Sequence, residues 1–209
     1  MTTVIVSTSE LVGRLAPGPG PVTGPVPEAA QATAEAIGPW RISTALPSDR
    51  AALGSLFSGC SQETVRLRFF GRLRAFPREY LDSVLAGRPD VHDAVVAYRD
   101  DRSHLVGLAG LVAESDENPG VAELGVLVTD TWQRQGAGAA MVDTLLTRAR
   151  ERGIVRVSAC VLPGRSGLLA TLSRRLELES SSGTRDGLTG IYRLAQGGDA
   201  SRGTTRPSP

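Results

Sequence analysis

The chain has 209 residues, of which 41% are hydrophobic and 22% charged, the composition of one soluble globular domain with some length left over. Its formal net charge of +1 gives no bulk electrostatic basis for binding nucleic acid or an anionic membrane. All 23 basic residues are arginines, and the lack of lysine excludes Walker A, Schiff-base and protein-kinase chemistry.

The sequence contains no apolar run long enough to span a bilayer and no pattern of a secretory signal. Two cysteines, Cys60 and Cys160, are too few for a disulfide scaffold. We therefore expect a cytoplasmic protein that binds neither a membrane nor nucleic acid.

The two ends of the chain differ in composition from its middle. Residues 1–39 hold six of the 13 prolines, interspersed with Gly and Ala, and are predicted to be a disordered arm with a short helical turn near 28–37. Residues 196–209 are rich in Gly, Ser, Thr and Pro and are predicted to be a disordered tail. The folded domain is expected to span residues 40–195.

Periodicity and capping residues predict a mixed α/β domain. The pattern indicates strands at 40–46, 93–98, 104–114, 121–129, 155–162, 176–181 and 188–194, and helices beginning at Pro47, Ser61, Pro77, Gly138 and Ser166. The clearest helix runs from Gly138 to Arg152, with its apolar side chains on one face. The strand before it and the strand after it form a β-α-β unit.

A glycine-rich turn connects the strand at 121–129 to this helix. Gly136 and Gly138 lack Cβ atoms, so a phosphate can approach the unpaired amides at the helix N-terminus. The helix dipole also favours an anion there. A dinucleotide fingerprint fits poorly, because Met141 is too large for its third small position.

The segment from Trp132 to Gly138 reads W-Q-x-x-G-x-G and resembles the Q/R-x-x-G-x-G/A motif of the GNAT superfamily of acyl-CoA-dependent N-acyltransferases. The resemblance implies the GNAT fold, a mostly antiparallel central sheet with a β-α-β unit that binds acetyl-CoA. It implies main-chain contacts to the CoA diphosphate from Gln133, Arg134, Gln135, Gly136, Ala137, Gly138 and Ala139, and to the pantetheine arm from Val126, Leu127 and Val128. No metal is expected.

Glu123 lies inside an otherwise apolar strand, where a carboxylate is costly unless it has a partner or a role. Strand alternation puts it on the face of Gly125 and Leu127. An amine acceptor arrives protonated at neutral pH, and a carboxylate beside the thioester can take that proton. By similarity to GNAT enzymes, Glu123 is the predicted general base. A salt-bridged structural glutamate is the alternative.

A closer resemblance is to bacterial GNAT-type protein lysine acetyltransferases. The segments SQETVRLRFFG (61–71), VAELGVLVTDTWQRQGAG (121–138) and VLPGRSGLLATLSRRLEL (161–178) are similar to elements of that group. The resemblance implies transfer of an acetyl group to a protein lysine, with Arg68, Phe69 and Phe70 beside the acceptor entrance. Ordinary core packing is the alternative for the two phenylalanines. A small-molecule amine as acceptor, or a non-catalytic acyl-CoA-binding module, are the alternative functions.

Two positions depart from the GNAT pattern. Arg165 stands where many members carry an Asn that contacts CoA, and Ser173 stands where many carry a Tyr that protonates the departing thiolate.

Three other groups of residues are expected to have no catalytic role. His92 and His104 are interpreted as exposed or turn histidines, and Cys160 as an inert core residue. Arg72, Arg74 and Arg78 are interpreted as a solvated basic surface, with contact to the CoA 3′-phosphate or an acidic substrate as the alternative.

Overall fold

The structure is a computed structural model that describes residues 35–114, 120–185 and 187–195. The predicted tail at 196–209 and most of the predicted arm lie outside these ranges. No helix among the described residues has the length and apolar character needed to cross a bilayer.

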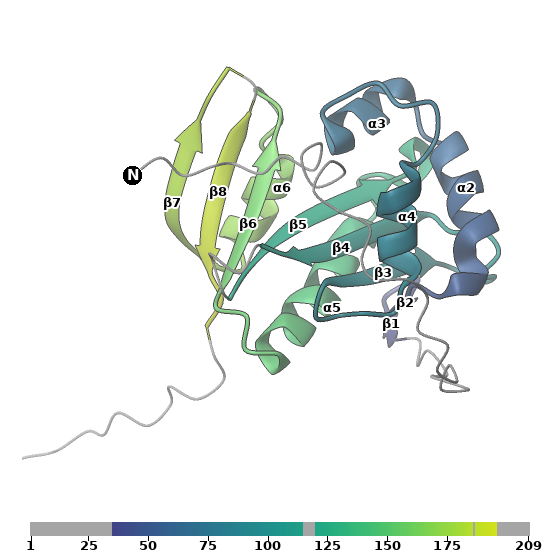
Figure 1. The fold of residues 1–209 in the computed structure, drawn as a ribbon, viewed down its shortest axis with the longest axis horizontal. Coiled ribbons are helices and arrows are strands. Elements are labelled where there is room, and N and C mark those ends of the chain that lie inside the picture. The colour runs from purple at the N-terminus through teal and green to yellow at the C-terminus, as the bar shows by residue number, and fades with distance from the viewer. Residues whose placement is uncertain (1–34, 115–119, 186, 196–209) are drawn as a thin grey trace, which may run out of the picture.

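The strands form a single sheet in the order β1-β2-β3-β4-β5-β6-β8-β7 (Figure 1). Every neighbouring pair is antiparallel except β5 and β6, which run parallel. The strands are β1 (Glu35–Ile37), β2 (Trp40–Thr44), β3 (His92–Tyr98), β4 (Gly107–Ala113), β5 (Val121–Val128), β6 (Arg156–Val161), β7 (Glu177–Gly183) and β8 (Leu188–Arg193). The mostly antiparallel sheet and its one β-α-β unit confirm the predicted mixed α/β fold.

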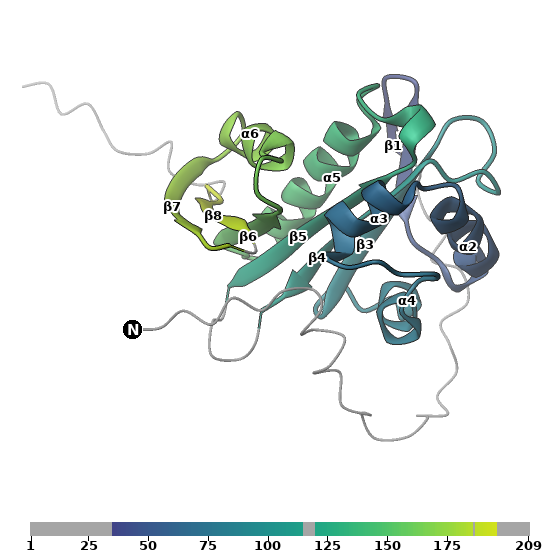
Figure 2. The ribbon, with the colours of Figure 1, turned by 90° about the horizontal axis from the view of Figure 1, so that it is seen from above.

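Helices cover both faces of the sheet, as the view from above shows (Figure 2). The helix α5 (Ala137–Glu151) lies on one face, and α2 (Arg50–Ser58), α3 (Gln62–Phe69) and α4 (Arg78–Leu85) lie on the other, with α6 (Gly167–Ser173) over β6 and β8. Short 3-10 helices, η1 (Pro47–Asp49) and η2 (Asp130–Trp132), precede α2 and α5. The hydrophobic core is accordingly divided into one cluster on each side of the sheet.

The amphipathic pattern of α5 produces the larger cluster. Met141, Val142, Leu145, Leu146 and Ala149 are all buried, as the sequence predicts. Burying a side chain of this size contributes about 1.5–3 kcal/mol, which holds α5 against the sheet. The Gly-rich turn at its N-terminus is thereby fixed at the end of β5.

The parallel pair β5 and β6 is joined only over Val121–Glu123 and Arg156–Ser158. The next five residues of β5, up to Val128, stay paired with β4 but have no partner on β6 within the described chain. In Figure 1 the two strands are close at one end and diverge toward the other. Their divergence opens the sheet into a V whose apex is at Glu123.

Two boundaries differ from the sequence predictions. Residues 35–37, placed by the sequence in the arm and its helical turn, form β1 instead, because Gly38 adopts a left-handed conformation (φ 61°) that allows a tight turn onto β2. The strand β7 covers Glu177–Gly183, so it begins one residue later and ends two residues later than the predicted strand at 176–181.

Candidate functional site

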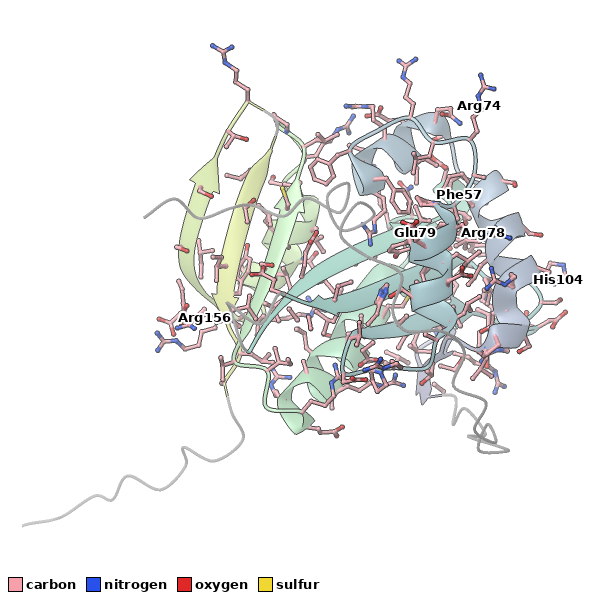
Figure 3. The ribbon with its side chains drawn as sticks, viewed as in Figure 1. Phe57, Arg74, Arg78, Glu79, His104 and Arg156 are labelled. Carbon is pink, nitrogen blue, oxygen red and sulfur yellow. The ribbon has the colours of Figure 1, made fainter. Side chains whose placement is uncertain are left out.

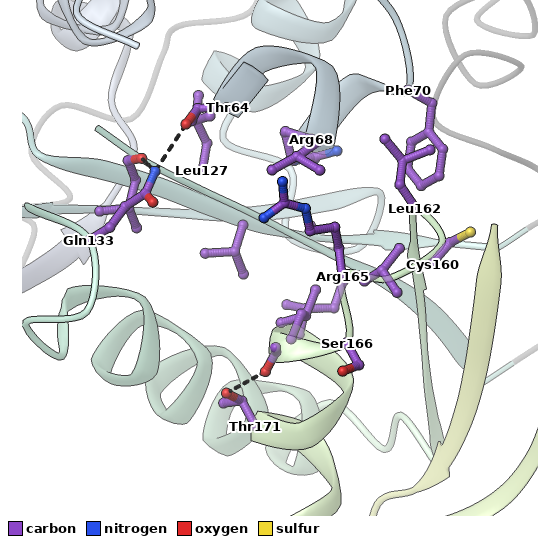
Figure 4. Close-up of a pocket in the computed structure, with 18 of the residues that line it drawn as sticks. Thr64, Arg68, Phe70, Leu127, Gln133, Cys160, Leu162, Arg165, Ser166 and Thr171 are labelled. Atoms are coloured by element: carbon purple, nitrogen blue, oxygen red, sulfur yellow. Dashed lines mark hydrogen bonds between the residues drawn. The ribbon is translucent and has the colours of Figure 1, made fainter. Parts of the chain in front are cut away.

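A cavity of about 600 Å³ fills the V between β5 and β6. Thr64, Arg68 and Phe70 of the α3 segment lie on one side, and Cys160, Leu162, Ser166 and Thr171 on the other (Figure 4). The cavity is lined by Thr64, Leu67, Arg68, Phe70, residues 123–128, Gln133, Arg134, residues 160–162 and 164–168, and Thr171.

Six of the predicted site residues line this cavity, namely Glu123, Val126, Leu127, Val128, Gln133 and Arg134. The other five, Gln135, Gly136, Ala137, Gly138 and Ala139, form the rest of the turn and the first turn of α5. The structure therefore brings all the predicted residues into one continuous strand, turn and helix start. Their contacts with CoA remain a prediction.

The turn has the backbone geometry of an anion site. Gly136 precedes α5 in a left-handed conformation (φ 94°), which glycine adopts without steric cost. Arg134 has a left-handed φ as well (61°). The amides of Ala137, Gly138 and Ala139 open the helix and have no intrahelical acceptor, so they remain available to an anion.

A polar contact ties this turn to α3. The Asp130 carboxylate accepts hydrogen bonds from the Ser61 amide (2.7 Å), the Ser61 hydroxyl (2.8 Å) and the Thr64 hydroxyl (2.8 Å). Burial works to raise the pKa of Asp130, but these hydrogen bonds outweigh it and lower that pKa. Gln133 donates to Thr64 Oγ1 (3.0 Å) and to the Val128 carbonyl (3.1 Å). The N-terminus of α3 and the turn are thus one hydrogen-bonded unit.

Glu123 lies at the apex of the V, half-buried, with Val112 of β4 and Ser158 of β6 as its neighbours across the sheet. Burial raises the pKa of the nearby Cys160 thiol, and the charge of Glu123 raises it further. Cys160 is half-buried and lines the cavity, so the expectation of a core residue was wrong for its position. Its raised pKa keeps it a protonated thiol beside the carboxylate.

Arg68 of α3 is buried on the cavity wall (Figure 4). Its guanidinium lies against Gly125, which is two residues along β5 from Glu123. The guanidinium donates to the Tyr80 hydroxyl (3.0 Å) and lies 5.0 Å from the Phe69 ring centroid. A Cβ on Gly125 would be 2.1 Å from Nη2 and 2.3 Å from Cζ, so the glycine is required by the close approach of this side chain.

We predict that Gly125→Ala forces the guanidinium of Arg68 out of its place and lowers the free energy of unfolding by about 1–3 kcal/mol. Gly54→Ala is the matched control, because Gly54 is exposed within α2 and a Cβ there meets nothing within 4 Å. In the control variant the free energy of unfolding should rise by about 0.5–1 kcal/mol, because alanine is a better helix former than glycine. Denaturant titration measures both, and equal effects would contradict the account of Arg68.

His92 is buried (3% exposed), and the expectation of an exposed or turn histidine was wrong. It starts β3 on the face covered by α4, where its Nδ1 lies 3.1 Å from the Ser83 hydroxyl. Its Nε2 has no hydrogen-bond partner within the described residues and packs over Gly110. Burial lowers the pKa of His92 to about 4, and the positive charge of Arg68 adds to the effect.

The low pKa of His92 predicts a pH-dependent stability. Between about pH 6.5 and pH 4 the unfolded chain binds a proton on this histidine that the folded chain does not, so the free energy of unfolding falls as the pH falls. His92→Gln should remove up to about 3 kcal/mol of this decline. Denaturant titrations across the window test it, with the exposed His104 changed to Gln as the control. Parallel curves for wild type and His92→Gln would contradict the assignment.

The remaining sequence predictions divide between core and surface. Phe69 is buried in the cluster with Phe57 and Tyr80, which confirms core packing, whereas Phe70 lines the cavity. Arg72, Arg74, Arg78 and His104 are exposed, and Arg74 and His104 point outward in Figure 3. The described residues contain no cluster of three side chains that could hold a metal ion.

The two departures from the GNAT pattern lie in different places. Arg165 lines the cavity and pairs with Glu63 of α3 at 3.3 Å, across the V. Ser173 is exposed and does not line the cavity, and its hydroxyl lies 3.4 Å from that of Tyr192. Among the described residues that line the cavity there is no tyrosine.

Comparisons with known proteins agree with this geometry. The model of the Acetyltransferase (GNAT) family matches residues 59–171. The fold is similar to the GNAT domain of S. lividans PAT, with 20% identity, 74% of this chain and 90% of that chain covered, and a TM-score of 0.66.

Two further solved structures share the fold. A putative acetyltransferase, yncA from Salmonella typhimurium, solved with its cofactor acetyl-CoA, is 15% identical over 79% of this chain and 99% of that chain (TM-score 0.57). The ribosomal-protein-S5-alanine acetyltransferase from Vibrio fischeri is 10% identical over 78% and 97% (TM-score 0.61).

Proposed function

Because the chain belongs to the GNAT acetyltransferase family and is an acetyl-CoA-dependent N-acetyltransferase, we propose that its acceptor is the side-chain amine of a protein lysine. The observation that carries the proposal is the position of Glu123. Its carboxylate is half-buried where β5 and β6 separate, in the cavity that extends to the Gly-rich turn.

In this proposal the turn and β5 hold acetyl-CoA. The amides at the start of α5 bind the diphosphate, because they are unpaired and at the positive end of the helix dipole. The pantetheine arm lies along Val126, Leu127 and Val128, whose side toward β6 has no strand partner among the residues that the structure describes. The arm occupies the position that a paired strand would have beside β5. In this position its thioester points toward Glu123 at the apex of the V.

Glu123 then acts as the general base. A lysine ammonium has an ordinary pKa of about 10.4 and must lose a proton before its nitrogen can attack. The carboxylate takes that proton, directly or through one water, and the nitrogen lone pair attacks the thioester carbonyl. An amide on the open side of β5 stabilises the oxyanion. The C–S bond breaks and the CoA thiolate leaves. The nitrogen gives up its second proton to water, so the neutral N-acetyl product forms while the first proton is left on Glu123.

The cavity wall supports an acceptor with an aliphatic stem. Leu67 and Phe70 of the α3 segment and Leu162 after β6 offer apolar surface, and Glu123 offers a carboxylate at the end. Phe70 and Cys160 both lie within 3.5 Å of the Cβ that Gly187 lacks, so they close this end of the cavity together. A lysine has the matching pattern of four methylenes and a terminal cation. The protein substrates named for structural neighbours such as the ribosomal-protein-S5-alanine acetyltransferase also favour a protein acceptor.

The departing thiolate leaves without a tyrosine acid in this proposal. Thr171 faces the cavity, but its hydroxyl donates to the Gly167 carbonyl at 3.0 Å. A CoA thiolate is a stable enough anion to leave unprotonated, since a thiol has a pKa near 8.5.

We predict that Glu123→Gln lowers kcat at least 100-fold while the Kd for acetyl-CoA stays within about twofold. The reason is that the amide keeps the size of the side chain but cannot accept the acceptor's proton. Calorimetry gives the Kd and a thiol-release assay gives kcat. The matched control is Glu179→Gln, a half-buried glutamate on β7 that is paired with Arg156 and Arg193 outside the cavity and should keep wild-type turnover. Unchanged turnover in Glu123→Gln would exclude the base role.

Because this chain contains no lysine, acetylation of its own lysine side chains cannot contribute to the signal when acceptors are tested. With radiolabelled acetyl-CoA and a denatured-and-refolded lysate, we expect label on lysines of other proteins and none on the side chains of this one. Peptide mapping by mass spectrometry identifies the modified residues. Label found only on small amines would replace the protein acceptor with a metabolite, and acetyl-CoA binding with no transfer to either would indicate a binding module.

A further inference from the structure

The indole of Trp40, near the start of the folded domain, contacts the Gly-rich turn, which lies far along the chain. Trp40 starts β2 and is 3% exposed, and its Nε1 donates a hydrogen bond to the Gln135 carbonyl at 3.0 Å. Ninety-five residues separate the donor from the acceptor. The family motif covers the turn alone, so it does not point to this contact.

The direction of this hydrogen bond fixes the direction of the next amide. In a trans peptide the C=O and the N–H point to opposite sides. Because a buried indole holds the Gln135 carbonyl toward the core, the Gly136 N–H points outward, where Gly136 itself is exposed. This amide makes no hydrogen bond within the described part of the chain, and it lies directly before the three free amides of α5.

The indole is itself held in place. Trp132 packs edge-on against it, with ring centroids 5.8 Å apart, and the Arg99 guanidinium lies 5.8 Å from the Trp40 ring and 5.5 Å from the Trp132 ring. Its Nε1 is 3.6 Å from the position of a Cβ on Gly136. The hydrogen bond therefore starts from a side chain whose rotamer is fixed by packing on several sides.

We propose that Trp40 is a positioning residue for the CoA diphosphate: its indole N–H holds the Gln135 carbonyl inward and thereby turns the Gly136 amide toward the ligand. The inference rests on the proposed binding of the diphosphate at the turn. Without the hydrogen bond the 135–136 peptide is free to rotate, and binding then has to order it.

The test separates the hydrogen bond from the packing of the ring. Trp40→Phe keeps an aromatic ring and removes the N–H donor, and a site-specific replacement of Trp40 by 3-benzothienylalanine keeps the bicyclic shape as well. We expect both changes to weaken acetyl-CoA binding about 5- to 10-fold and to raise KM by a similar factor with kcat unchanged. Acetyl-pantetheine, which has no diphosphate, should bind and react equally well in wild type and variants.

The control is Tyr192→Phe. It also removes a hydrogen bond from a buried aromatic side chain to a backbone carbonyl, that of Leu169 at 3.1 Å, but Tyr192 lies away from the turn and does not line the cavity, so acetyl-CoA affinity should stay at the wild-type value. Thermal melting of each variant gives its loss of stability. The benzothienyl protein decides the result if Trp40→Phe does not fold.

The outcomes distinguish this inference from the proposed function. Equal loss of affinity for acetyl-CoA and acetyl-pantetheine would make Trp40 a structural residue only, and no loss for either would exclude the positioning role. A wild-type protein that ignores acetyl-CoA would instead overturn the binding proposal on which the inference rests.

Discussion

The incomplete pairing of β5 with β6 is the constraint on which the site depends. Three residue pairs hold the parallel strands together, and beyond Glu123 the two halves of the sheet separate. A sheet with unpaired main-chain groups at its centre is stable only if something else covers them. In this chain the α3 segment and the loop after β6 form walls on either side of the gap, and in the proposed function the pantetheine arm of acetyl-CoA covers the open side of β5.

Much of this architecture follows from local sequence signals. Hydrophobic periodicity and glycine spacing predict the buried face of α5, the hairpin of β3 and β4, and the Gly-rich turn. Each of these depends on residues that are close together in the chain. The strand β1 was missed because three residues have no stable structure of their own and form a strand only by pairing with β2.

The residues whose surroundings the sequence analysis missed owe them to contacts with distant parts of the chain. Nothing in the segment around His92 distinguishes a surface histidine from a buried one, since its burial is made by α4 from the preceding segment and by Gly110 from the following strand. The same holds for Trp40, whose partner is a backbone carbonyl and leaves no trace in side-chain pattern. Gly125 is a partial exception. An isolated glycine inside a strand indicates that another group approaches the backbone closely, but the sequence does not identify Arg68 as that group.

The helix α3 also connects the two ends of the cavity. Its first residues are bound to Asp130 in the turn, and the residue that follows it, Phe70, stands beside Cys160 at the far end of the cavity. The eight residues of α3 measure about 12 Å, so the helix sets a fixed distance between the turn and the end of the cavity at Cys160. A change in the length or register of α3 would break its hydrogen bonds to Asp130 or displace Phe70, whereas a substitution at Leu67, in the middle of the helix, alters the cavity wall without moving either end.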